Sequence, residues 1–136
     1  MSDPRFVIAL PIADRPTSHE FYREVLGLEA PGEPAEDGVP EPLQFPLGGG
    51  VDLMLVPTGG FQWAIGGQPV TPDDHHETVI TLAATSPAEV DDLVDRARRA
   101  GARVVVEPGD QSWGYTATFT DPDGHLWAAL VSPADS

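Results

Sequence analysis

The sequence contains no cysteine and no lysine: its seven basic residues are all arginine. Without cysteine the chain can form no disulfide, no thiolate metal site and no cysteine nucleophile. Any metal would have to be held by histidine, aspartate or glutamate side chains.

Positive charge is scarce, because 7 basic residues stand against 22 acidic ones and the net charge is −15. A field of that sign repels nucleic acid and anionic membranes and favours cationic small molecules. Basic stripes interleaved with aromatic residues are also missing, so we expect no nucleic-acid partner. The alternative reading, that the acids only keep the protein soluble, stays open.

Long apolar runs are absent, although 40% of the residues are hydrophobic. A membrane-spanning helix needs about 18 or more consecutive apolar residues, so we expect a globular protein with no membrane span. The opening stretch, "MSDPRFVIALPIADRP", carries an acid and a proline where a signal peptide would carry basic residues. These features predict a cytoplasmic protein with a single hydrophobic core.

An internal repeat organises the chain. The apolar run "VIAL" at 7–10 recurs as "VITL" at 79–82, and the same offset aligns Asp14 with Ser86. The second helix start is the clearer one, because "SPAE" places Ser86 at the N-cap and Glu89 where a capping box needs a carboxylate. Each copy therefore predicts a strand followed by an amphipathic helix.

Short β-like segments follow each predicted helix. The first copy has "LEA" at 28–30, "LQFPLGG" at 43–49 and "VDLMLVP" at 51–57; the second has "RVVVEP" at 103–108, "GYTATFT" at 114–120 and "HLWAALV" at 125–131. The last two flank the turn "DPDG" and predict a hairpin.

The fold class predicted is thus α+β, with two tandem β-α-β-β-β modules at about 5–57 and 77–132 joined by a linker at 58–76. The linker carries Phe61 and Trp63. Flexible linkers rarely carry two large aromatic residues, so we expect this segment to be partly ordered and packed on the pocket or on a partner subunit.

This organisation resembles the vicinal-oxygen-chelate superfamily, which contains glyoxalases, extradiol dioxygenases and bleomycin-resistance proteins. The resemblance rests on a strand ending in Ala13-Asp14, on Phe21-Tyr22 followed by Leu26-Gly27, and on "DPDG" before the last strand. It implies that each module curls into a half-closed cup and that two modules together enclose one pocket. Metal-dependent members place four ligands on strands facing that pocket. The resemblance predicts the fold, whereas the activity has to be inferred from the site.

Counting along the family pattern places the four metal positions in this chain. Seven residues before the helix starts are Val7 and Val79, and seven residues after the first acid of "DPDG" is Ala128. The fourth position lies in "VDLMLV", at either Met54 or Asp52. Hydrocarbon cannot coordinate a divalent cation, which needs about four to six oxygen or nitrogen donors. We therefore predict no metal and no other cofactor.

One alternative would restore a metal site. His75, His76 and Glu77 lie just before Val79, and a shift of strand register could turn one of them toward the pocket. Adjacent strand residues point to opposite faces, so a single histidine with one acid would be a poor site.

Four aromatic residues raise further alternatives. Trp113 and Tyr115 share a phase with Phe119 in "SWGYTATF", so they either form a stacking wall for a flat ligand or pack in the core. Trp127 alternates with its neighbours, so either it or they face outward, and an exposed Trp127 would suggest an interface.

These observations favour a metal-independent protein that binds a small organic molecule of aromatic or cationic character. The predicted ligand-binding residues are Val7, Val79, Trp113, Tyr115 and Ala128. The same observations also predict a homodimer. The alternative from another class is a divalent-metal lyase or dioxygenase using His76, Glu77 and Asp52. A third hypothesis is a module that binds another protein through the linker.

Overall fold

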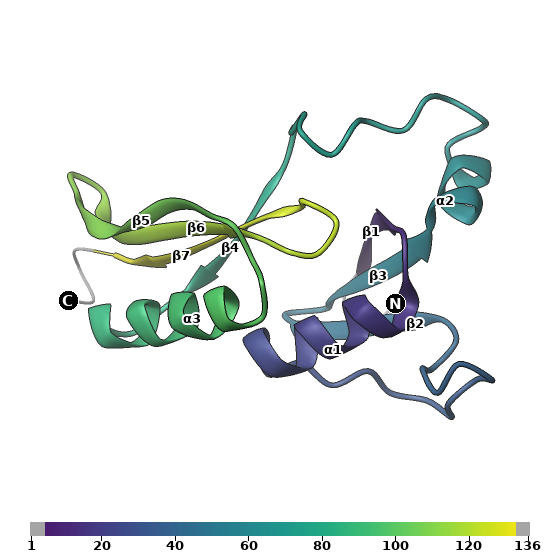
Figure 1. Cartoon of the computed structure of the whole chain (residues 1–136), viewed down its shortest axis with the longest axis horizontal. Helices are drawn as coiled ribbons and strands as arrows, with labels where there is room; N and C mark the ends of the chain where they lie inside the picture. The colour runs from purple at the N-terminus through teal and green to yellow at the C-terminus, as the bar shows by residue number, and fades with distance from the viewer. Residues whose placement is uncertain (1–4, 133–136) are drawn as a thin grey trace. The chain divides into compact units, whose positions relative to one another are not determined.

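The computed structural model describes residues 5–132. By its internal contacts the chain divides into two compact units, residues 1–71 and 72–136, and each is described by itself (Figure 1). The unit boundary falls inside the predicted linker. No helix in the described part of the chain is long and apolar enough to cross a membrane.

The first unit contains a three-stranded sheet in the order β1-β3-β2. Its strands are β1 (Phe6–Ile12), β2 (Leu43–Gly48) and β3 (Val51–Pro57), with helix α1 (Arg15–Leu26) and the short helix α2 (Thr58–Ala64). Strand β1 pairs with β3 in parallel, and β2 pairs with β3 antiparallel. The first module therefore has one strand fewer than predicted.

Residues 28–30, which the sequence predicts to be β-like, form no strand. The chain leaves α1 through Gly27, whose positive φ of 66° forms a left-handed C-cap, and the amide of Leu28 donates to the Tyr22 carbonyl oxygen at 3.1 Å. A long loop then runs to β2, and Arg15 of α1 holds it by donating to the Asp37 carboxylate at 2.9 Å and to the Val39 carbonyl oxygen at 2.8 Å. This ion pair lowers the pKa of the Asp37 carboxyl.

The second unit contains a four-stranded sheet in the order β4-β7-β6-β5. Its elements are β4 (Val79–Ala83), α3 (Pro87–Arg99), β5 (Val104–Gln111), β6 (Gly114–Thr120) and β7 (Leu126–Val131). This is the complete β-α-β-β-β module that the sequence predicts, and it includes the β6–β7 hairpin. With the first unit it confirms the α+β class.

Both repeats begin their helices as the alignment predicts. Asp14 caps α1 by accepting from the Thr17 amide at 2.9 Å, and Ser86 caps α3 by accepting from the Glu89 amide at 3.2 Å. The Glu89 carboxylate reaches back to the hydroxyl of Thr85, at 2.6 Å, one residue earlier than a capping box requires. The hydrogen bond from Thr85 lowers the pKa of Glu89.

Helix α3 covers one face of the second sheet (Figure 1). Its buried side chains lie on one side of the helix: Val90, Leu93, Val94 and Ala97. Facing them, alternate residues of β6 and β7 are buried: Ala117, Phe119, Trp127, Ala129 and Val131. Trp127 is only 3% exposed, so it is a core residue, and the prediction that it could contribute to an interface is wrong.

Gly114, the first residue of β6, lies so close to the end of β7 that a side chain would not fit there. Its φ is +138°, and a Cβ atom built there would collide with the carbonyl oxygen of Val131 and lie 3.0 Å from Leu130 Cδ1. Only glycine fits between the two-residue turn before β6 and the end of β7.

We expect Gly114→Ala to destabilise the protein by about 2 kcal/mol or more. The positive φ is unfavourable for alanine, and the added Cβ would collide with the Val131 carbonyl oxygen. Gly109→Ala in neighbouring β5 is the matched control. Gly109 has no positive φ, and the nearest atom to its added Cβ lies 3.9 Å away. Urea denaturation of both variants measures the difference, and equal stabilities would contradict the prediction.

Candidate functional site

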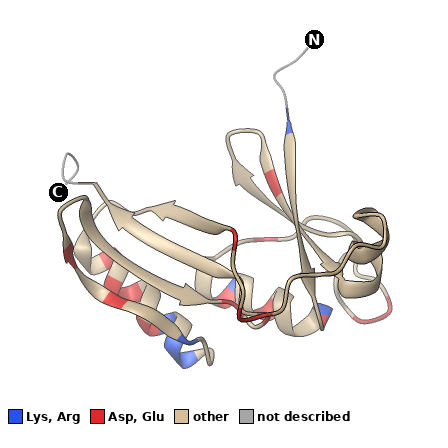
Figure 2. Cartoon of the chain, turned by 90° about the horizontal axis from the view of Figure 1, so that it is seen from above, with Lys and Arg blue, Asp and Glu red and all other residues tan. Residues whose placement is uncertain are grey.

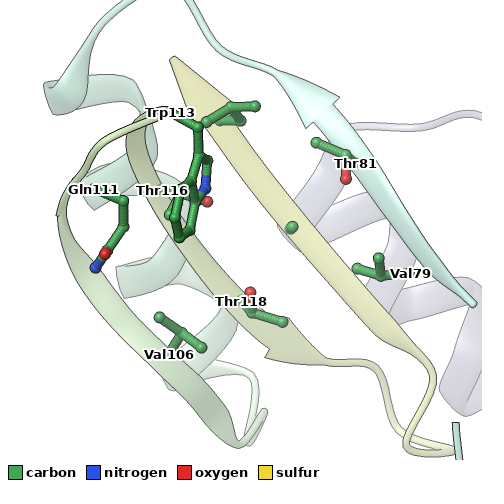
Figure 3. Close-up of a pocket in the computed structure, with 9 residues that line it drawn as sticks. Val79, Thr81, Val106, Gln111, Trp113, Thr116 and Thr118 are labelled. Carbon is green, nitrogen blue, oxygen red and sulfur yellow. The ribbon is translucent and has the colours of Figure 1, made fainter. Parts of the chain in front are cut away.

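The second sheet leaves its other face uncovered by α3, and a hollow of about 440 Å³ lies on this face. Hollows of a few hundred cubic ångströms are the size that proteins use for small organic ligands. All four strands and the β5–β6 turn contribute to its lining (Figure 3). The lining residues are Val79, Thr81, Val106, Gln111, Trp113, Thr116, Thr118, Ala128 and Leu130.

The alternation of the strands explains this lining. In β7 the residues Leu126, Ala128 and Leu130 are partly exposed, whereas the residues between them are buried toward α3. Antiparallel pairing sets Ala128 opposite Thr118 of β6. The open face is therefore made of small apolar side chains and hydroxyls, with no charged residue among the nine that line the hollow.

Trp113 reaches the hollow from a turn and not from a strand. Residues 112–113 form the two-residue connection between β5 and β6, and the side chain of Trp113 is on the hollow side of the sheet (Figure 3). The residue is 60% exposed. A largely exposed indole beside an apolar hollow provides a flat surface for stacking.

Tyr115 lies on the opposite face of the same sheet. Its hydroxyl donates to the Asp91 carboxylate of α3 at 2.6 Å, and this hydrogen bond raises the pKa of the Tyr115 phenol. The prediction that Trp113 and Tyr115 share one face is wrong, because it assumes that both residues are in one strand. Strand β6 begins only at Gly114, so Trp113 is in the turn before it. Phe119 is fully buried, as the core alternative predicted.

Of the five predicted ligand-binding residues, the hollow thus brings together Val79, Trp113 and Ala128. Val7 is in β1 of the first unit, 52% exposed and paired with Asp52 of β3. The sequence reasoning missed the threonines and Gln111. The period-two pattern of "GYTATFT" places Thr116 and Thr118 on one face and could have indicated them.

Strand register settles the fourth metal position of the family pattern. In the second unit Ala128 pairs with Thr81, and in the first unit the repeat equivalent of Thr81 is Ala9, which pairs with Met54. Met54, not Asp52, therefore corresponds to Ala128. The four positions hold Val7, Met54, Val79 and Ala128, and none offers the oxygen or nitrogen donors that a divalent cation needs.

Asp52 is the one buried acid of β3, with 7% of its surface exposed. Its Oδ2 atom accepts from Arg5 at 3.1 Å and from the Gln44 side-chain amide at 2.9 Å. The Asp52 carboxylate is therefore engaged in an ion pair with Arg5. The metal-enzyme alternative, which needs Asp52 as a ligand, loses one of its three donors.

The other residues of the metal alternative are exposed in the segment before β4. His75 lies 2.7 Å from the Asp74 carboxylate, and His76 and Glu77 are exposed. Over residues 5–132 no group of three or more histidine, aspartate or glutamate side chains could hold a metal ion. The donors present do not fit the metal that the fold family implies.

Acidic side chains of the second unit gather on α3, with arginines at its C-terminal end (Figure 2). The helix carries Glu89, Asp91, Asp92 and Asp95 on its exposed surface. This helix lies on the far side of the sheet from the hollow. The sheet therefore separates the four acids of α3 from the hollow.

Comparison with solved structures finds the same fold in several proteins. A hypothetical protein from S. aureus is 29% identical, with a TM-score of 0.77 over 96% of this chain and 94% of that one. A glyoxalase-related enzyme from Fulvimarina pelagi is 22% identical, with a TM-score of 0.80 over 98% and 90%. An antibiotic-binding protein from Streptomyces sp. CB03234 is 24% identical, with a TM-score of 0.65 over 97% of each chain.

A comparison with curated proteins found no match. The family pattern described as Glyoxalase/Bleomycin resistance protein/Dioxygenase superfamily matches residues 6–129. This match includes both capped helices and the "DPDG" turn, and it ends within β7. The chain belongs to the glyoxalase/bleomycin resistance protein/dioxygenase superfamily.

Proposed function

We propose that this protein binds a flat, hydrophobic small molecule on the open face of its second sheet and does so without a metal ion. The observation that carries the proposal is the hollow itself, whose lining combines hydrocarbon, hydroxyls and an exposed indole. Such a surface binds through apolar contact and stacking.

Val79 and Ala128, which occupy positions where the family pattern places metal ligands, support binding without a metal ion. Val79 and Ala128 are on neighbouring strands of the hollow, and their side chains can offer only apolar contact. One relative of the same fold is an antibiotic-binding protein, so the fold accommodates binding of an organic molecule. No observation favours the lyase or dioxygenase alternative over binding.

A preference for cations would come from the net charge of −15 and not from the lining, which carries no charge. Exposed charges farther away than about 8 Å are largely screened at physiological salt. We therefore propose that stacking and apolar contact supply the affinity, and that the negative field only speeds the arrival of cationic ligands.

Replacing Trp113 by Ala should weaken binding of aromatic compounds by roughly 1 to 3 kcal/mol, the range for loss of a large aromatic contact. Isothermal titration calorimetry with cationic, neutral and anionic aromatic compounds measures this and the charge preference together. Calorimetry is needed because the substitution removes one of the three tryptophans that fluorescence would report.

Two variants serve as controls for that experiment. Tyr115→Phe removes a hydroxyl on the α3 side of the sheet, and Trp63→Ala removes an indole that is 81% exposed in the first unit. Both should leave affinity unchanged. Binding that is indifferent to Trp113→Ala would refute the proposed site, and equal or tighter binding of anions would refute the electrostatic effect.

Divalent metals should not stabilise the protein. A site with micromolar Kd in millimolar Ni²⁺, Zn²⁺, Mn²⁺ or Fe²⁺ would add about 4 kcal/mol by mass action, which raises Tm by several degrees for a domain of this size. We expect no such rise in thermal denaturation. A rise that disappears in His76→Ala would support the metal-enzyme alternative.

We also propose that the protein is a homodimer. Strand β1 is at the edge of its sheet and carries exposed Phe6, Val7 and Ile8, and Trp63 of α2 is exposed as well. Edge strands and apolar patches of this kind are covered in many proteins by a second chain. Light scattering at micromolar concentration should give the dimer mass, and a monomer mass throughout that range would refute the proposal.

A further inference from the structure

Three residues form one row across the centre of the hollow. Thr81 of β4 pairs with Ala128 of β7, and Ala128 pairs with Thr118 of β6. All three line the hollow, and the two threonine side chains stand on either side of β7 (Figure 3). The methyl group of Ala128 leaves the space between the two hydroxyl-bearing side chains open.

The hydroxyls in the hollow differ in their hydrogen bonds. Thr116 is also in the lining, but its hydroxyl donates to the Ala129 carbonyl oxygen at 2.9 Å. Across residues 5–132, Thr81 and Thr118 make no such side-chain bond to the protein. Their hydroxyls are therefore available both to donate to a ligand and to accept from it.

A purely hydrocarbon ligand would bind poorly over this row. It would strip water from two hydroxyls and return no hydrogen bond, and an unsatisfied polar group is costly to cover. A ligand with oxygen atoms at the right places would replace the lost water. Sites with hydrogen-bonding groups of this kind discriminate strongly against analogues that lack the matching group.

The spacing of the row restricts where those oxygens are. Neighbouring strands are about 4.8 Å apart, so the Thr81 and Thr118 backbones, two strands apart, are separated by roughly 9.6 Å. With hydrogen bonds of about 2.8 Å reaching inward from each side, the ligand oxygens lie roughly 4 to 9 Å apart. That separation matches oxygens on opposite edges of a system of one or two fused rings.

We infer that Thr81 and Thr118 determine the specificity of this site, by hydrogen bonding to a flat aromatic ligand that carries oxygen atoms on two opposite edges. Trp113 stacks on the ring system, and Ala128 allows the ring to settle between the two threonines. This inference rests on the proposed function of the same face, and it adds the chemical class of the ligand.

The test compares two probes of one shape, 2,6-dihydroxynaphthalene and naphthalene, by NMR titration. The wild-type protein should bind the diol roughly 25-fold more tightly, as expected for two hydrogen bonds that each contribute about 5-fold. Thr81→Val and Thr118→Val should each reduce that ratio about 5-fold without weakening naphthalene. The double variant should abolish the preference for the diol.

Two sets of control variants separate a ligand contact from a structural effect. Tyr115→Phe removes a hydroxyl from the α3 face of the same strand β6, outside the hollow, and should leave the ratio unchanged. Thr81→Ser and Thr118→Ser keep a hydroxyl and should keep the preference for the diol. These serine variants still test the inference if a valine variant fails to fold.

The outcomes distinguish this inference from the function on which it rests. Equal binding of the two probes, with both weakened by Trp113→Ala, overturns the role of the threonines and leaves the binding site standing. Valine variants that weaken both probes equally overturn it too, because the effect is then structural. If neither probe binds the wild-type protein, the proposed binding face and this inference both fail.

Discussion

The packing of the β6–β7 hairpin against α3 is the interaction on which the functional face depends. Phe119 of β6 and Trp127 of β7 are buried on the helix side, and they anchor the strands in one register. Because side chains alternate, burying one set of residues commits the other set to the open face. A slip by one residue would place Trp127 in the hollow and Ala128 in the core.

The two ends of this hairpin are built to keep that register. At one end Asp121, only 3% exposed, accepts from the amides of Asp123 and His125, at 2.9 and 2.8 Å, and so closes the "DPDG" turn. At the other end Gly114 lies against Val131 where no side chain fits. Gly114 also ends the turn that carries Trp113, so the same glycine sets both the strand register and the place of the indole.

The two repeats have diverged in what their strands carry while keeping one plan. Register pairs Asp52 with Val7 in the first repeat and Leu126 with Val79 in the second. The first strand pair therefore includes a carboxylate held by Arg5 and Gln44, where the second has a hydrocarbon side chain. The acids of α3 lie across the sheet from the hollow, so they contribute to net charge and solubility more than to ligand contact.

The sequence by itself was sufficient to predict the class of fold, the family, both helix starts and the final hairpin. These features depend on local patterns: a cap residue such as Ser86, a turn such as "DPDG" and the alternation of apolar residues along a strand. Val79 and Ala128, which the resemblance to the family places at metal positions, are found in one hollow. Residue type at those positions already disfavoured a divalent metal.

Only the tertiary structure decided which face each residue occupies and which strands pair. Strand pairing identifies Met54 as the equivalent of Ala128, and residues 28–30 pair with no strand. Trp127 is buried, and the Tyr115 hydroxyl donates to Asp91 of α3. The row of Thr81, Ala128 and Thr118 joins residues from three strands that are separated in the sequence. Facing and pairing depend on register and on which side a helix covers, and both are set by contacts between distant segments that no local pattern records.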